Sequence, residues 1–108
     1  MSSSMTSAEF VDCQSLAPGA LVDVETRNRH YRIECLGGSA IRISGHPDLC
    51  PTPEPATLQG SSDNAGVTES LISPGRYLQF VLQDRPVTTT RVMKVRVQRA
   101  PAVPSSIH

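Results

Sequence analysis

The segment with the most chemically capable side chains is His46-Pro47-Asp48-Leu49-Cys50. Imidazole, carboxylate and thiolate groups all bind zinc, and the neighbouring prolines would stiffen the loop that carries them. Structural zinc sites usually draw on two closely spaced ligand pairs, however, and the chain contains no Cys-x-x-Cys or His-x-x-x-His. Cys13 or His30 would have to complete the set from a distance. The segment's histidine, aspartate and cysteine are therefore weak metal candidates. We predict no bound cofactor and expect a half-buried cysteine under the loop.

A second candidate site is the last predicted strand, which carries Arg91, Lys94 and Arg96. Its alternation places Lys94 and Arg96 on one side, with Arg91 across a proposed bulge and Tyr77 nearby. Small barrels bind single-stranded nucleic acid through basic grooves with aromatic platforms. These residues support nucleic-acid binding as an alternative function, and the other interpretation is a solvated strand face.

Nucleophilic catalysis requires a serine or cysteine beside a base that a third group orients. The chain has no Gly-x-Ser-x-Gly motif, and His30, His46 and His108 fall at a predicted turn, in a loop and at the last residue. We predict no catalytic residues and no enzymatic activity. The remaining enzymatic alternative is a metal-linked enzyme that uses the ligand types of the 46–50 segment.

The charges balance overall, with ten basic and ten acidic residues, so no global field attracts nucleic acid or a membrane surface. They are unevenly placed along the chain. Residues 76–99 carry six basic side chains and one acidic side chain, whereas residues 8–25 carry four acidic side chains and no basic one. We expect the two segments to meet on one folded surface, and the alternative is a basic patch for RNA or DNA.

Three cysteines cannot all pair within one chain, and residues 1–9 have neither the basic start nor the apolar run of a secretory signal. We therefore expect a reduced, cytoplasmic setting. Since no segment approaches the roughly 20 consecutive apolar residues of a membrane helix, we expect no membrane partner.

Two Pro-Gly turns, at Pro18-Gly19 and Pro74-Gly75, each precede an alternating strand and a tight hairpin. With no amphipathic helix, this pattern predicts an all-β fold, a small antiparallel barrel or sandwich of about six strands built from hairpins. We expect one domain over residues 16–98, between flexible tails at 1–15 and 99–108.

The first three strands are predicted to form a meander that begins at Leu21–Arg27, where strand alternation places Val22, Val24 and Thr26 on the inward face. A turn at Asn28-Arg29 would place Val22 opposite Cys35 and Glu25 opposite Arg32. A three-residue loop at 37–39 would place Glu34 opposite Arg42 and Cys35 opposite Ile41.

The middle of the chain, residues 45–56, contains four prolines and is predicted to be a long surface loop. A short edge strand at 57–61 and a turn at 62–66 should follow, and residues 67–72 are ambiguous. A loop at 84–86 would pair Leu82 with Thr88, and a β-bulge near Val92-Met93 would turn Met93 inward.

Three short pieces carry a resemblance: Thr26-Arg27-Asn28 followed by Tyr31, then Leu58-Gln59-Gly60-Ser61-Ser62, and then Pro86-Val87-Thr88-Thr89-Thr90. Together they resemble a group of small uncharacterised bacterial all-β proteins, over about residues 16–97. The resemblance implies a bacterial β domain. It implies no function and no site residues.

These observations favour a non-catalytic binding or interaction module whose partner is a protein or a second copy joined at an exposed strand edge. The proline loop, with His46 and Leu49, is the expected recognition element, because a stiff loop on a β scaffold loses little entropy on binding.

Overall fold

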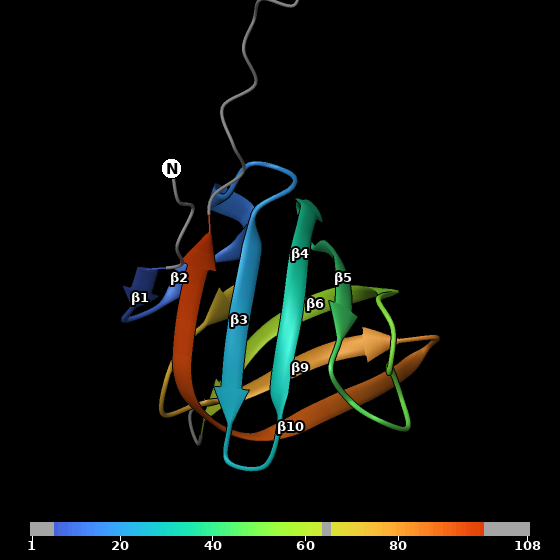
Figure 1. The fold of residues 1–108 in the computed structure, drawn as a ribbon. Helices are drawn as coiled ribbons and strands as arrows, with labels where there is room; N and C mark the ends of the chain where they lie inside the picture. The colour runs from blue at the N-terminus through green and yellow to red at the C-terminus, as the bar shows by residue number, and fades with distance from the viewer. Residues whose placement is uncertain (1–5, 64–65, 99–108) are drawn as a thin grey trace, which may run out of the picture.

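The computed structural model describes residues 6–63 and 66–98, so the tail expected at 99–108 and the first five residues lie outside the described part. Within those ranges the chain forms ten strands and one 3₁₀ helix (Figure 1). Their bounds are β1 (Thr6–Ala8), β2 (Val11–Asp12), η1 (Cys13–Ser15), β3 (Leu21–Thr26), β4 (His30–Gly37), β5 (Ala40–Ser44), β6 (Glu54–Asp63), β7 (Gly66–Glu69), β8 (Leu71–Ile72), β9 (Tyr77–Leu82) and β10 (Arg85–Gln98).

Six strands close into a ring of antiparallel pairs. The order is β10, β3, β4, β5, β6 and β9, and β9 pairs with β10 again. Figure 1 shows β3 and β4 crossing in front of β6 and β9. The long strand β10 joins the two layers, because its first half pairs with β9 and its second half with β3. The predicted small antiparallel all-β fold is confirmed.

The barrel interior follows from strand alternation. Val22 and Val24 of β3 point inward and are fully buried, as are Leu78 and Phe80 of β9. The Phe80 ring packs edge-on against Tyr31, with 6.2 Å between ring centroids. Aliphatic side chains thus fill most of the core around one aromatic pair.

The meander register is confirmed at one hairpin and wrong at the other. Glu34 lies opposite Arg42, with 3.0 Å between Oε1 and Nη1. In the β3–β4 hairpin the turn falls one residue earlier than predicted, because the Thr26 hydroxyl bonds both the N–H and the carbonyl of Arg29. This change shifts the pairing of β3 with β4 by two residues, so the same side chains still face inward. The partner of Arg32 changes, however, and is Asp23 rather than Glu25.

Residues 6–15 are not a free tail, contrary to the prediction. Strand β1 pairs with β10, strand β2 pairs with β8, and the Cys13 N–H donates to the Ser70 carbonyl at 3.0 Å. Val11, Cys13 and Leu16 are buried. Figure 1 shows this segment at the end of the barrel where β3 begins and β10 finishes. Its buried apolar side chains extend the core.

Strand β6 corrects the prediction of a short edge strand and shortens the proline loop. It begins at Glu54, and β5 and β9 flank it on opposite sides. Pro55 is compatible with this strand because β5 alone pairs with that stretch, among the described residues. A strand with one neighbour leaves alternate N–H groups outside the ladder, and a proline can occupy such a position.

The β9–β10 hairpin is tighter than predicted. Leu82 pairs with Arg85, and the two turn residues, Gln83 and Asp84, have φ of 52° and 64°. Positive φ at both positions is typical of the two-residue turn that matches strand twist. The bulge near Val92 is confirmed, but Met93 is the extra residue and is 57% exposed, not inward-facing.

A second bulge, between Thr88 and Arg91, depends on one hydroxyl group. Thr89 Oγ1 accepts a hydrogen bond from the buried Leu78 N–H at 3.2 Å and donates to the Thr90 carbonyl at 2.7 Å. The side chain thereby supplies the acceptor that the interrupted ladder lacks.

Replacing Thr89 with valine should lower the free energy of unfolding by about 1–3 kcal/mol, because an isosteric methyl leaves a buried N–H without its acceptor. Urea denaturation would measure the change. Thr90→Val is the matched control, since the Thr90 side chain is exposed and only its carbonyl takes part. Equal losses in the two variants would contradict this role for the hydroxyl.

Candidate functional site

Four side chains from four strands form one row across the outer face of the barrel. Ser62 of β6 pairs with Val67 of β7 on one side and with Tyr77 of β9 on the other, and Tyr77 pairs with Arg91 of β10. Residues directly opposite one another in antiparallel strands project to the same face. Val67 is 49% exposed and Tyr77 is 37% exposed. We call these four residues the outer row.

The outer row ends at Arg91, whose side chain contacts Tyr77 and whose backbone contacts Arg27. The Arg91 guanidinium lies over the Tyr77 ring, 5.9 Å from its centroid, at the distance of a cation–π contact. The Arg27 N–H donates to the Arg91 carbonyl at 3.2 Å, which brings the exposed β3–β4 turn alongside. The turn backbone at Arg27 therefore adjoins this end of the row.

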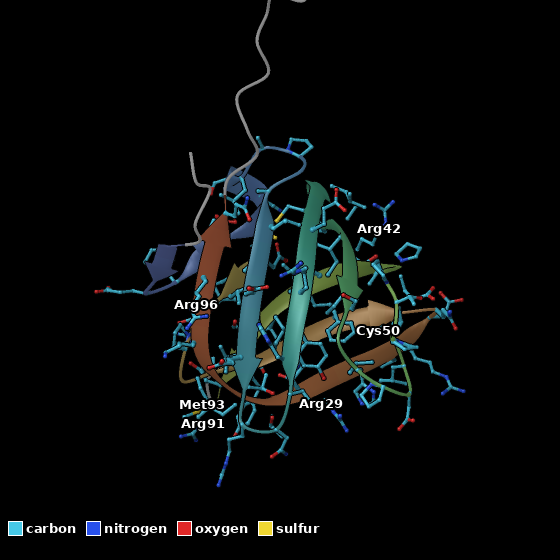
Figure 2. The ribbon with its side chains drawn as sticks, in the orientation of Figure 1. Arg29, Arg42, Cys50, Arg91, Met93 and Arg96 are labelled. Atoms are coloured by element: carbon cyan, nitrogen blue, oxygen red, sulfur yellow. The ribbon has the colours of Figure 1, made fainter. Side chains whose placement is uncertain are left out.

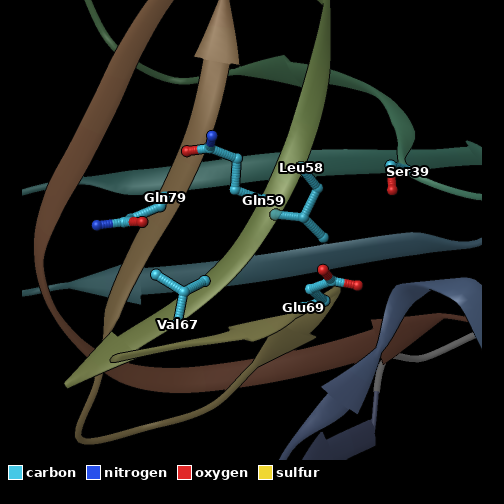
Figure 3. Close-up of a pocket in the computed structure, with 6 residues that line it drawn as sticks. All are labelled: Ser39, Leu58, Gln59, Val67, Glu69 and Gln79. Carbon is cyan, nitrogen blue, oxygen red and sulfur yellow. The ribbon is translucent and has the colours of Figure 1, made fainter. Parts of the chain in front are cut away.

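A groove of about 410 Å³ adjoins the outer row (Figure 3). It lies where one edge of β6 passes from β5 to β7, and Val67 borders both the groove and the row. Backbone groups that border the groove already form hydrogen bonds with each other. The Leu58 N–H donates to the Ser39 carbonyl, and the Gln59 carbonyl accepts from the Ser70 N–H. The groove therefore offers side-chain groups to a ligand, from Ser39, Gln59, Glu69 and Gln79.

The basic residues predicted for nucleic-acid binding have different kinds of cross-strand partner. Lys94 lies opposite Glu25, and Arg96 lies opposite Asp23. The Asp23 carboxylate, 10% exposed, also bonds Arg32 Nε at 3.3 Å. The acidic and basic segments thus meet on one surface, as their sequence positions predicted, and Arg91 is instead paired with Tyr77.

The proline-loop candidates have structural contacts of their own. His46 Nδ1 accepts hydrogen bonds from the N–H groups of Asp48 and Leu49, each at 3.1 Å, and so caps the turn. Cys50 is fully buried, not half-buried as expected, and burial raises the pKa of its thiol. Leu49 packs partly against the core. Asp48 is exposed, so the three metal-ligand types of this loop face different environments.

The proline-loop site and the basic-strand site predicted from the sequence do not form one site. Figure 2 shows Cys50 on the opposite side of the barrel from Arg91 and Arg96. Among residues 6–63 and 66–98, no group of three His, Cys, Asp or Glu side chains is placed to hold a metal ion.

The sequence interpretation missed Val67 and Glu69, because residues 67–72 were left without a strand assignment, and it gave no role to Gln59 of the predicted strand 57–61. One signal could have found Val67. A hairpin turn inside the polar segment 62–66 predicts Ser62 opposite Val67, and the structure pairs these two residues.

In the part of the chain that is described, no helix has the length and apolar character needed to span a bilayer. No protein-family model, no curated protein and no solved structure matches this chain. The outer row and its groove are therefore the features that bear on function.

Proposed function

We propose that this protein is a non-catalytic binding module, and that the outer row with its groove is the surface that contacts a protein partner. The observation that carries the proposal is the alignment of Val67, Tyr77 and Arg91 on three strands of one sheet. Hydrogen-bonded strands fix the backbone positions from which these side chains project, so little backbone entropy is lost when a partner binds. The proposal includes a bacterial, cytoplasmic setting, which is inferred from the sequence alone.

The chemistry of the row defines the partner segment. Exposed Val67 and Tyr77 favour an apolar or aromatic side chain, and the Arg91 guanidinium favours a carboxylate. The amide groups of Gln59 and Gln79 can exchange hydrogen bonds with an extended backbone. A segment of another protein that combines acidic and apolar residues fits these features.

The test compares the wild-type protein with a Tyr77→Ser/Arg91→Glu double variant. Each would be immobilised, and retained proteins from a bacterial lysate would be quantified by mass spectrometry and then tested as purified partners. We expect the double variant to bind the partner at least 10-fold more weakly, since exposed tyrosine and arginine often dominate interface energies. Arg85→Glu is the control for charge, because Arg85 is exposed and lies outside the row.

Two outcomes would contradict the assignment of the surface. The double variant could keep the wild-type partner at unchanged affinity, or the control could lose it equally. Native mass spectrometry of the untagged protein would show whether the partner is a second copy of the chain.

Nucleic-acid binding is the second candidate, and the stacked Tyr77–Arg91 pair is the observation that favours it. Fluorescence anisotropy with a single-stranded oligonucleotide would test it across a range of salt concentrations. Affinity that falls steeply with salt and is lost in Arg91→Glu would make nucleic acid the ligand. Affinity that is unchanged after charge reversal at Arg91, Lys94 and Arg96 would exclude this function.

A further inference from the structure

Two buried cysteine sulfurs lie almost within bonding distance of each other. Cys13 in η1 and Cys35 in β4 are free thiols, and their Sγ atoms are 2.6 Å apart. A disulfide bond is about 2.05 Å long, so a small movement would bring the sulfurs together. Cysteines that pack only as small apolar residues do not need this proximity.

Backbone hydrogen bonds hold both residues in place. The Cys13 N–H donates to the Ser70 carbonyl at 3.0 Å, and the Cys35 N–H donates to the Ala20 carbonyl at 2.9 Å. The Cys35 carbonyl accepts from the Gly19 N–H at 2.8 Å. The approach of the two sulfurs is therefore a property of the fold at this end of the barrel.

The thiols differ in reactivity. The two sulfurs share a hydrogen bond in which either one can be the donor, and the contact with Cys13 lowers the pKa of Cys35. The same contact, together with burial, raises the pKa of Cys13 far above its usual range. Cys35 is thus the thiol that ionises first and the better initial nucleophile.

The Cys13 side of the pair belongs to the segment that can open. Residues 6–16 are attached through the three residues of β1, the two residues of β2 and the Cys13 N–H bond to Ser70, whereas Cys35 lies within an eight-residue barrel strand. Short terminal elements open locally at lower free energy than central strands. Such opening would expose both sulfurs to a small oxidant.

We propose that Cys13 and Cys35 form a reversible intrachain disulfide that fastens the N-terminal segment to the barrel. The Cys35 thiolate attacks one sulfur of a low-molecular-weight disulfide such as oxidised glutathione, and one glutathione thiolate leaves. Cys13 loses its proton to solvent and attacks the Cys35 sulfur of the mixed disulfide, and the second glutathione leaves. Two protein thiols are oxidised and one glutathione disulfide is reduced to two glutathione molecules.

The experiment equilibrates the whole chain with defined ratios of reduced to oxidised glutathione. Thiols would then be alkylated in denaturant and counted by mass. We expect the three thiols of the chain to fall to one, with Cys50 remaining free. Tm should rise by about 10 °C, because the bond closes a loop in the unfolded chain. Amide exchange of residues 6–16 should slow, because the bond keeps this segment from opening.

Cys50→Ala is the matched control and should keep the rise in Tm, whereas Cys13→Ala should lose it. Peptide mapping of the oxidised wild type identifies the linked cysteines directly, so the result does not depend on whether a variant folds. Three free thiols at every glutathione ratio, a stable mixed disulfide, or a link that includes Cys50 would each overturn the proposal. None of these results bears on the outer row.

Discussion

Replacing Phe80 with alanine is expected to lower the free energy of unfolding by about 3–5 kcal/mol. Phe80 is fully buried in β9, where its cross-strand neighbours are Leu58 of β6 and Val87 of β10. Its ring also packs edge-on against Tyr31 of β4. Truncation would remove contacts to both layers of the barrel, and a closed ring of strands has little freedom to collapse into the cavity.

Urea denaturation followed by circular dichroism would measure the loss. Phe80→Leu should cost less, since much of the volume remains, and Phe10→Ala should change the free energy of unfolding little because Phe10 is largely exposed. A small effect of Phe80→Ala, comparable to that of Phe10→Ala, would show that the core does not depend on this ring.

Strand alternation predicted which side chains face inward, but it could not fix every register. In β3 the inward residues Val22 and Val24 were assigned correctly although their partners on β4 were wrong. A shift of two residues leaves the inward set unchanged, so the hydrophobic pattern does not distinguish the two registers. Hydrogen bonds between Thr26 and Arg29 select the observed one.

Two errors with proline have a common physical cause. Pro55 lies in β6 and Pro86 lies in β10, where the sequence had predicted loops. Both fall where the described ladder pairs the strand on one side: Pro55 with β5 and Pro86 with β9. Long strands that change partners along their length create such positions, and a local interpretation of proline cannot locate them.

Local sequence patterns could not predict the candidate site, for a related reason. The outer row requires the registers of β7, β6, β9 and β10 to be known together, and each depends on a turn or a bulge. The sequence did identify Arg91 and place Tyr77 near it, because both lie in one hairpin. Val67 joins them through Ser62, which belongs to a different hairpin.

Gly60→Ala is expected to lower the free energy of unfolding by about 3 kcal/mol or more, through two separate effects. Gly60 has φ of 139°, a conformation that residues with a Cβ atom rarely adopt. An added Cβ would also lie 2.0 Å from the Thr68 carbonyl oxygen, and that atom is backbone in the adjacent strand β7. Relief of this contact requires β6 and β7 to separate beside the groove.

Gly66→Ala separates the two effects. Gly66 has a similar φ of 126°, but a Cβ there would meet nothing within 4 Å. Its replacement should cost about 1–2 kcal/mol from backbone strain alone, and the excess loss in Gly60→Ala then measures the clash with β7. Chemical denaturation of both variants gives the difference. Equal losses would mean that β7 moves away from the added methyl group at no cost in free energy. Close packing of β7 on β6 would then not determine the shape of the groove wall.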